Sequence, residues 1–378
     1  MATREPSRSR FTGNRTCDVL TTHDHFARRS QGASTGRVHR GARRAATVAS
    51  LMVVLVMFGA GPALADPAAP TNYESTVLGM DPPSNAAVVR VTGGDAFLEV
   101  IVVPGHEFVV PGYFGEPYIR IDADGTVWVN EDSPAHYIND DRYGTTTAPE
   151  EADGRGAPRR VRVGEGGRYA WHDHRIHWMS YDRPPTVSGE SRQVVFPWSL
   201  PVVVDGTETR ITGELAWIPS RSVVAPLLAG MIALLPLVAA ARYRSSAIAL
   251  LIVGAAALAA VVAVAQANGT PAPARGFPVM MVLPLVALIA GLWAIAGRTP
   301  GSLSPTLLTL TAGLALAAWA LATAEVLWLP ILPSALPRQL ERFAVAFVFW
   351  AGVGAVVAAA AESAPGLRRT KTPSSSAA

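Results

Sequence analysis

At 378 residues, of which 49% are hydrophobic, the chain is too long and too apolar for one ordinary soluble domain. The net charge of +3 hides an acidic middle: residues 66–220 carry twelve arginines, no lysine and twenty-three acidic residues, a balance that argues against nucleic-acid binding. The single cysteine, Cys17, excludes an internal disulfide, and its place in the N-terminal segment leaves the rest of the chain without thiolate, iron–sulfur or blue-copper chemistry.

Residues 1–65 are predicted to form a disordered, Arg-rich n-region followed by a secretory signal peptide. The apolar run Ala45–Ala60 leads to Ala63-Leu64-Ala65, a small-x-small cleavage site. The long n-region is explained by a true start nearer Val38, and an uncleaved signal anchor is the alternative. Residues 66–84 are rich in Pro and Ala and are predicted to be a linker.

Residues 85–220 show the pattern of an all-β domain. Short apolar, β-branched runs recur between Gly, Pro and Asp residues, which predicts a β-sandwich of the immunoglobulin or cupredoxin-like kind. Asp124-Gly125 and Asp205-Gly206 fit hairpin turns. The expected strands are Ala87–Val91, Phe97–Val103, Phe108–Val110, Tyr118–Ile121, Val127–Val129, Arg160–Val163, Tyr169–His174, Gln193–Phe196, Val202–Val204 and Thr209–Trp217.

Residues 221–362 are predicted to form an α-helical transmembrane bundle of five spans, with 363–378 as a disordered cytoplasmic tail. Each apolar segment has close to the ~20 residues that cross a bilayer core. Six basic residues in the expected inner loops and tail, against three outside, place the β domain outside the plasma membrane. The segments are Val223–Ala241, Ala247–Ala265, Phe277–Ala296, Leu303–Leu321 and Phe343–Ala361.

The predicted spans contain no His, Asp or Lys, which excludes bis-His haem ligation between them. Glu325, near the outer end of the fourth span, is the one candidate for a functional intramembrane carboxylate, although an interfacial carboxylate is the commoner interpretation. The segment Leu329–Pro333 is predicted to form an outer loop that touches the β domain.

The candidate site is Trp171–Met179, which holds three histidines and a methionine within nine residues. On a strand, His172 and His174 would share one face and could chelate one metal ion. His177 would join them only if the chain bends, and Met179 would add a soft ligand. Such a set suits copper or zinc.

Other side chains could complete or replace this site. His106 and His136 are further candidate metal ligands, and Asp173 and Glu107 are candidate carboxylates that orient an imidazole. The same carboxylates would be the general base if the domain were a metal-dependent hydrolase. The alternative is a structural network of these histidines with Asp173 and Arg175, which could also dock the domain on its own membrane part.

The segments Glu116–Arg120, Asn130–Ala135, Trp171–Met179 and the Asp205-Gly206 hairpin resemble a group of exported actinobacterial multi-pass membrane proteins. That resemblance implies the layout and no activity. The domain is also loosely similar to the CopC-type copper-resistance β-sandwiches, but Asp66 stands where those proteins have an N-terminal His ligand.

The sequence thus predicts a membrane-anchored extracytoplasmic β-sandwich that handles or senses copper or another transition metal through a His cluster. The alternative is a non-metal interaction or scaffolding module that holds an envelope protein partner. No catalytic residue is predicted.

Overall fold

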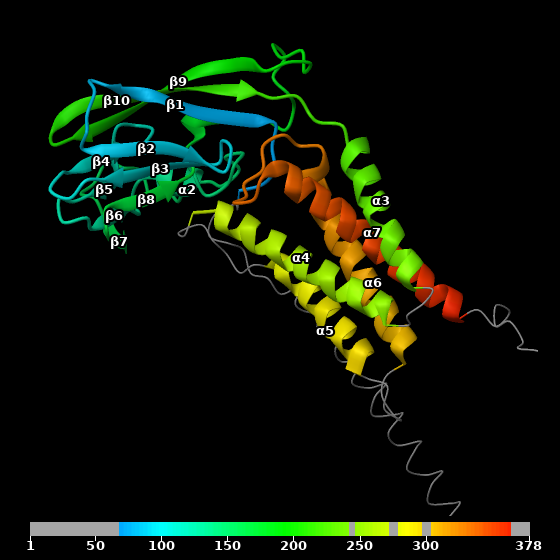
Figure 1. Ribbon diagram of the computed structural model, residues 1–378. Coiled ribbons are helices and arrows are strands. Elements are labelled where there is room, and N and C mark those ends of the chain that lie inside the picture. The colour runs from blue at the N-terminus through cyan, green and yellow to red at the C-terminus, as the bar shows by residue number, and fades with distance from the viewer. Residues whose placement is uncertain (1–67, 242–245, 272–278, 297–303, 364–378) are drawn as a thin grey trace, which may run out of the picture.

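The computed structural model describes residues 68–241, 246–271, 279–296 and 304–363. A β-sheet domain comes first and is followed by a bundle of apolar helices, which lie side by side and extend away from it (Figure 1). The predicted signal peptide and C-terminal tail lie outside the described residues.

Ten strands and two short helical segments build the β domain. The strands are β1 (Tyr73–Asp81), β2 (Ala87–Thr92), β3 (Phe97–Val102), β4 (Phe108–Pro111), β5 (Pro117–Ile121), β6 (Val127–Asn130), β7 (Arg160–Gly164), β8 (Arg168–Trp171), β9 (Gln193–Val204) and β10 (Thr207–Trp217). The helical segments are α2 (Pro134–Ile138) and the 3-10 helix η1 (His174–Ile176).

The strands form two antiparallel sheets, which confirms the predicted sandwich. One sheet has the order β1-β10-β9-β4-β5-β6-β7, and the other has the order β2-β3-β8. The inward side chains of both sheets make one apolar core, because alternate residues of a strand point to the same face. Its fully buried members include Leu98, Val100, Phe108, Ile119, Ile121, Leu200, Ile211 and Leu215.

The predicted linker is wrong for residues 73–81, which form the edge strand β1 beside β10. Ser75 is buried in this strand, and a buried hydroxyl is tolerated there because it accepts a hydrogen bond from the Trp198 indole at 2.9 Å. The sequence pattern does not predict this strand, because one of its inward positions is this serine and because Gly79 interrupts the apolar residues.

Strand β9 is one continuous strand, although two strands separated by prolines were expected. Pro197 and Pro201 both face outward, and β9 pairs with β10 along its whole length. On its other side β9 pairs with β4 only at Val203 and Val204. The prolines therefore sit where β9 is a sheet edge, the position in which a missing N–H leaves no partner unsatisfied.

The helical region contains α3 (Val224–Ala241), α4 (Ala247–Gly269), η3 (Val279–Met281), α5 (Val282–Ala296), α6 (Pro305–Ala322), η4 (Ala324–Leu327) and α7 (Arg338–Ser363). Among the described residues, four helices are long and apolar enough to cross a membrane: Ala247–Gly269, Val279–Ala296, Pro305–Ala322 and Arg338–Ser363. The predicted number of five spans is therefore wrong by this measure.

Helix α3 is not among these four: it is counted as an apolar helix only over Val224–Pro236, although the helix itself continues to Ala241. It nevertheless lies along α7 (Figure 1). The Trp350 indole donates to the Leu227 carbonyl at 3.0 Å, and Gly230 packs directly on the backbone of Ala346. Helix α3 is thus part of the bundle even though it is not one of these four candidate spans.

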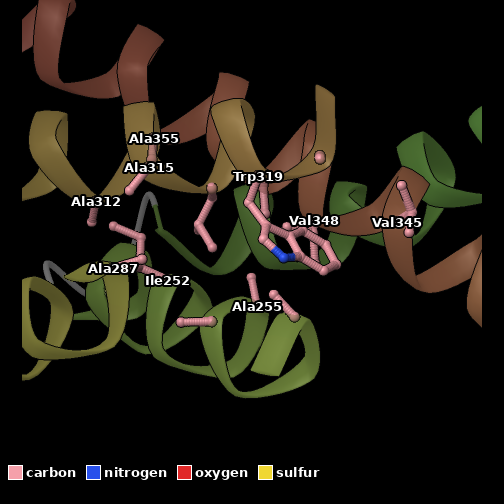
Figure 2. Packing of buried hydrophobic residues seen from close by; sticks show 14 of the residues in the cluster. Ile252, Ala255, Ala287, Ala312, Ala315, Trp319, Val345, Val348 and Ala355 are labelled. Carbon is pink, nitrogen blue, oxygen red and sulfur yellow. The ribbon is translucent and has the colours of Figure 1, made fainter. Parts of the chain in front are cut away.

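Small residues let the helices approach closely. Figure 2 shows the large Trp319 side chain of α6 near Ala255 of α4 and Val348 of α7. Gly313 and Gly352 meet where α6 crosses α7, and a Cβ on either would lie 2.9 Å from a carbonyl oxygen of the other. Such contacts are typical of helices that associate in a membrane, where packing replaces the hydrophobic effect.

Candidate functional site

The Trp171–Met179 segment begins where β8 ends. Trp171 is the last residue of the strand, and Asp173 then caps η1 by accepting a hydrogen bond from the Arg175 amide at 3.1 Å. The prediction that His172 and His174 lie on one face of a strand is therefore wrong. The chain does bend before His177, which the metal hypothesis required.

An ion pair around a fully buried carboxylate forms the centre of the segment. Asp173 has no exposed surface, and its two carboxylate oxygens accept from Arg175 Nε and Nη2, each at 2.7 Å. The Trp171 indole donates to the same carboxylate at 2.9 Å. Arg175 in turn lies over the Tyr113 ring at 5.0 Å from its centre. Asp173 therefore stabilises the fold of the segment. It was a candidate for orienting an imidazole, but its carboxylate binds Arg175 and Trp171 instead.

His172 is a packing residue. Its ring lies 4.1 Å from that of Phe97 between centres, and only 4% of the residue is exposed. Phe97 belongs to a small cluster with Ala96 and Ala170 beside the main core. The packing of the His172 ring against Phe97 thus explains why a histidine is buried at this position.

His174 and His177 are brought together, with their ring centres 5.2 Å apart and their planes perpendicular. His174 Nε2 lies 2.8 Å from the Asp141 carbonyl and must donate to it, because a carbonyl only accepts. By the same reasoning His177 Nδ1 donates to the Trp178 carbonyl at 3.3 Å. In the neutral form of each imidazole, the lone pair is therefore on the opposite nitrogen, Nδ1 of His174 and Nε2 of His177.

Burial strongly favours neutral His177. The residue is 1% exposed, and its Nε2 has no hydrogen-bond partner within the described part of the chain. Burial, followed by repulsion from Arg142 and His174, lowers the pKa of His177 to about 3. The side chain is therefore an unprotonated imidazole at neutral pH, with an unused lone pair.

Met179 ends the segment near His174. Both side chains approach Gly144, so that a Cβ placed on this glycine would lie 3.0 Å from Met179 Cε and 3.0 Å from His174 Cε1. Gly144 also has a positive φ of +64°. A larger residue at this position would thus collide with both candidate ligands.

The other predicted ligands lie elsewhere. His106 pairs with Asp205 at 2.7 Å on the exposed turn between β9 and β10. His136 lies in α2 against the ring of Tyr137. Glu107 binds Arg120 at 2.7 Å, not an imidazole. Across the residues that the structure describes, no group of three or more His, Cys, Asp or Glu side chains could hold a metal ion.

The segment lies at the end of the domain that meets the helical region. Trp171 pairs with Leu98 on β3, and β3 follows the turn at Gly94. This turn touches Ile331, whose backbone exchanges two hydrogen bonds with Thr71 at 3.0 and 3.1 Å. The predicted contact between segment 329–333 and the β domain is confirmed.

A second buried ion pair links this turn to the histidines. Asp95 is fully buried beside Gly94 and accepts from Arg142 at 3.0 Å. Burial raises the pKa of Asp95, although Arg142 opposes that effect. Arg142 also repels protonated His177, as described above. Neither residue was singled out from the sequence, because residues so far apart in the chain show no shared pattern.

The helical region holds one polar pair that the sequence interpretation missed. Helix α7 begins at Arg338, five residues before the expected span, and this brings Glu341 into the bundle. Glu341 has no exposed surface and accepts from Gln266 Nε2 at 2.8 Å. Glu325, the predicted candidate, is exposed in η4. The charges of residues 338–342 place them before the expected span, which begins at Phe343.

No protein-family model matches this chain, and no curated protein or solved structure matches it either. The resemblances drawn from sequence segments therefore stay predictions, and function has to be argued from the site itself.

Proposed function

We propose that this protein is a membrane-anchored extracytoplasmic interaction module of the cell envelope, in which the histidine segment is a structural network. The observation that supports it best is the joint between domain and helices, defined as Thr71, Gly94, Arg221, Trp328 and Ile331. Here the domain contacts the segment between α6 and α7 through the backbone. The joint holds the domain at a set place on the membrane part.

The joint consists of backbone hydrogen bonds, which fix the relative direction of the two segments they connect. Thr71 and Ile331 form a two-sided bridge, and the Arg221 amide donates to the Trp328 carbonyl at 2.7 Å. A flexible tether would need none of these bonds. The Asp173–Arg175 and Asp95–Arg142 pairs stabilise the end of the domain that carries the joint, which accounts for the polar residues of the segment without a ligand.

Exposed aromatic side chains beside the segment support an interaction surface. Phe114 is 78% exposed and follows Tyr113, whose hydroxyl accepts from the His174 amide at 3.1 Å. Tyr181 is 81% exposed and stacks on Tyr143 at 3.8 Å. Aromatic residues of this kind supply much of the binding energy at protein interfaces. We propose an envelope protein as the partner.

Photo-crosslinking tests this function in the full chain within its native membrane. A benzophenone amino acid at position 114 or 181 should give a discrete adduct, whereas one at Val88, which is 59% exposed on the β2 edge, should not. Adducts absent from both aromatic positions, or equally strong from position 88, would contradict the proposal.

The orientation is tested separately. We propose that the β domain is extracytoplasmic and that the tail is cytoplasmic, because α7 begins beside the joint and runs away from the domain (Figure 1). A reporter that is active only outside the cytoplasm, fused after Ala378, should stay inactive. The same reporter fused after Ser220 should be active, and an active reporter at both positions would contradict this orientation.

Copper binding is a second candidate function, supported by the lone pairs of the segment. His174 Nδ1 and His177 Nε2 are the unprotonated nitrogens, and Met179 lies beside His174. Two imidazoles and a thioether suit Cu(I), which prefers soft ligands, better than zinc. The expected ligand set is thus narrower than the one predicted from sequence.

Calorimetric titration of the full chain in detergent with Cu(I), Cu²⁺ and Zn²⁺ separates the two candidates. If copper binds here, His177→Ala should abolish Cu(I) binding and His106→Ala should leave it unchanged. If the network is structural, both variants should bind no metal tighter than a surface histidine pair. His177→Ala should then lower the unfolding temperature in metal-free buffer.

A further inference from the structure

Glu341 and Gln266 form a buried polar pair between α7 and α4, near the end of the bundle that faces the β domain. Gln266 Nε2 donates to Glu341 Oε1 at 2.8 Å. Glu341 Oε2 is buried and has no hydrogen-bond partner in the described ranges. One half of the carboxyl group is therefore satisfied and the other half is not.

The neighbouring charged groups do not neutralise this carboxyl group. Arg342 donates to the Leu327 carbonyl at 3.0 Å, and Arg338 donates to the Pro330 carbonyl at 3.1 Å. Arg221 is close enough to Arg342 to repel it. Glu325 in η4 is the other acidic side chain at this level, and the described parts of α3, α4, α5 and α6 contribute no titratable residue. The ion pairs of the described chain do not include Glu341.

A buried carboxylate without a counter-charge is costly, and inside a membrane bundle such a group marks a binding site. A metal cation would need several more oxygen ligands than one carboxylate and one amide offer. A proton needs only one further acceptor. The side-chain carbonyl of Gln266 is such an acceptor, because its amide nitrogen already donates to the same carboxyl group.

We propose that Glu341 and Gln266 form a proton-binding site reached from the extracytoplasmic side. A proton from water adds to Glu341 Oε2, and the resulting hydroxyl donates to Gln266 Oε1. The acid and the amide then close a ring of two hydrogen bonds. When the proton returns to water, one of these bonds is lost and a negative charge is left buried.

The position of the pair gives the proton a structural effect. The Ala335 amide donates to the Ala265 carbonyl at 3.3 Å, and Gly269 lies against Pro333, so segment 328–337 rests on the end of α4. The same segment carries Ile331 of the joint. The protonated pair fastens α4 to α7 beneath this segment, and loss of the proton loosens the support of the joint. Access from the extracytoplasmic side rests on the orientation proposed above, whereas the pair itself rests on neither proposed function.

Infrared difference spectroscopy of the full chain in lipid nanodiscs tests the proposal. A spectrum at about pH 6 minus one at about pH 9 should contain a C=O band of a protonated carboxylic acid, because the proposed site holds its proton in the first spectrum and has released it in the second. The band should vanish in Glu341→Gln and persist in Glu325→Gln, the matched control at the same level. In Gln266→Leu the band should shift to higher frequency, as expected when the hydrogen bonds to the acid are lost. Identical difference spectra for the wild type and Glu341→Gln would overturn the proposal.

Thermal unfolding gives a second readout. The folded protein holds a proton that the unfolded chain releases, so the wild type should lose stability as the pH rises. Glu341→Gln keeps a neutral pair and should remove that part of the pH dependence. An unchanged pH dependence in this variant would also overturn the proposal.

Discussion

The β domain and the helical region each bury an acidic side chain completely, but they neutralise it differently. Asp173 meets the Arg175 guanidinium with two bonds and a tryptophan with a third. Glu341 meets a single neutral amide. The domain can use a counter-ion because Arg175, two residues further along the chain, reaches Asp173 while 19% of its own side chain stays exposed. In the bundle the flanking arginines bind carbonyls instead, and we propose that a proton neutralises Glu341. We therefore expect the two regions to respond differently to loss of a charge and to pH.

The largest effect should follow from removing the counter-ion in the domain. Arg175→Met leaves Asp173 buried without a cation, which typically costs about 3–5 kcal/mol of folding free energy. Calorimetric unfolding of the full chain in detergent measures this loss. Arg168→Met is the matched control, because buried Glu99 retains Arg90 when Arg168 is removed. A similar loss in both variants would remove the special role assigned to Asp173.

An intermediate effect is expected at the joint between the regions. Gly94 has φ of +82°, and a Cβ there would lie 2.7 Å from Ile331 Cγ2. Gly94→Ala combines backbone strain of about 1–3 kcal/mol with this collision. It should speed hydrogen exchange at the Thr71 and Ile331 amides.

Gly115→Ala separates strain from collision. Gly115 has φ of +83° but no atom within 4 Å of its added Cβ, so only the strain applies. Exchange at Thr71 and Ile331 should keep its wild-type rate in this variant. Faster exchange in both would show that the domain, not the joint, had been weakened.

The smallest effect, counted per pH unit, is expected from the titration of His177. His177 has a folded-state pKa of about 3, below its ordinary value of 6.5, so between these values the unfolded chain binds more protons. Domain stability should therefore fall as the pH drops below about 6.5, by about 1.4 kcal/mol per pH unit for one proton. Denaturation curves in chelator-containing buffer should show a shallower slope for His177→Gln. The proton-binding site proposed for Glu341 and Gln266 predicts the opposite trend for the helical region.

Local patterns were enough to predict several features. The Asp205-Gly206 turn was predicted because only such residues accept the φ values of 50° and 78° found there. Four of the five apolar segments form helices of spanning length, since hydrophobicity over ~20 residues is a property of the segment alone. Strand β1 was missed because its inward Ser75 is explained only by Trp198, a residue more than a hundred positions later.

The sequence by itself distinguished a domain that folds in water from a region that folds in a membrane. Alternating apolar and polar residues indicate the first, unbroken apolar runs indicate the second, and both patterns are local. It also identified the histidine segment and the contact of segment 329–333 with the domain. Only the tertiary structure decided which polar groups are satisfied. It placed the His172 ring against Phe97, paired Asp95 with Arg142, and left Glu341 with one neutral partner, Gln266. Such pairings join residues that are distant in the chain, and their energy depends on burial that no local pattern records.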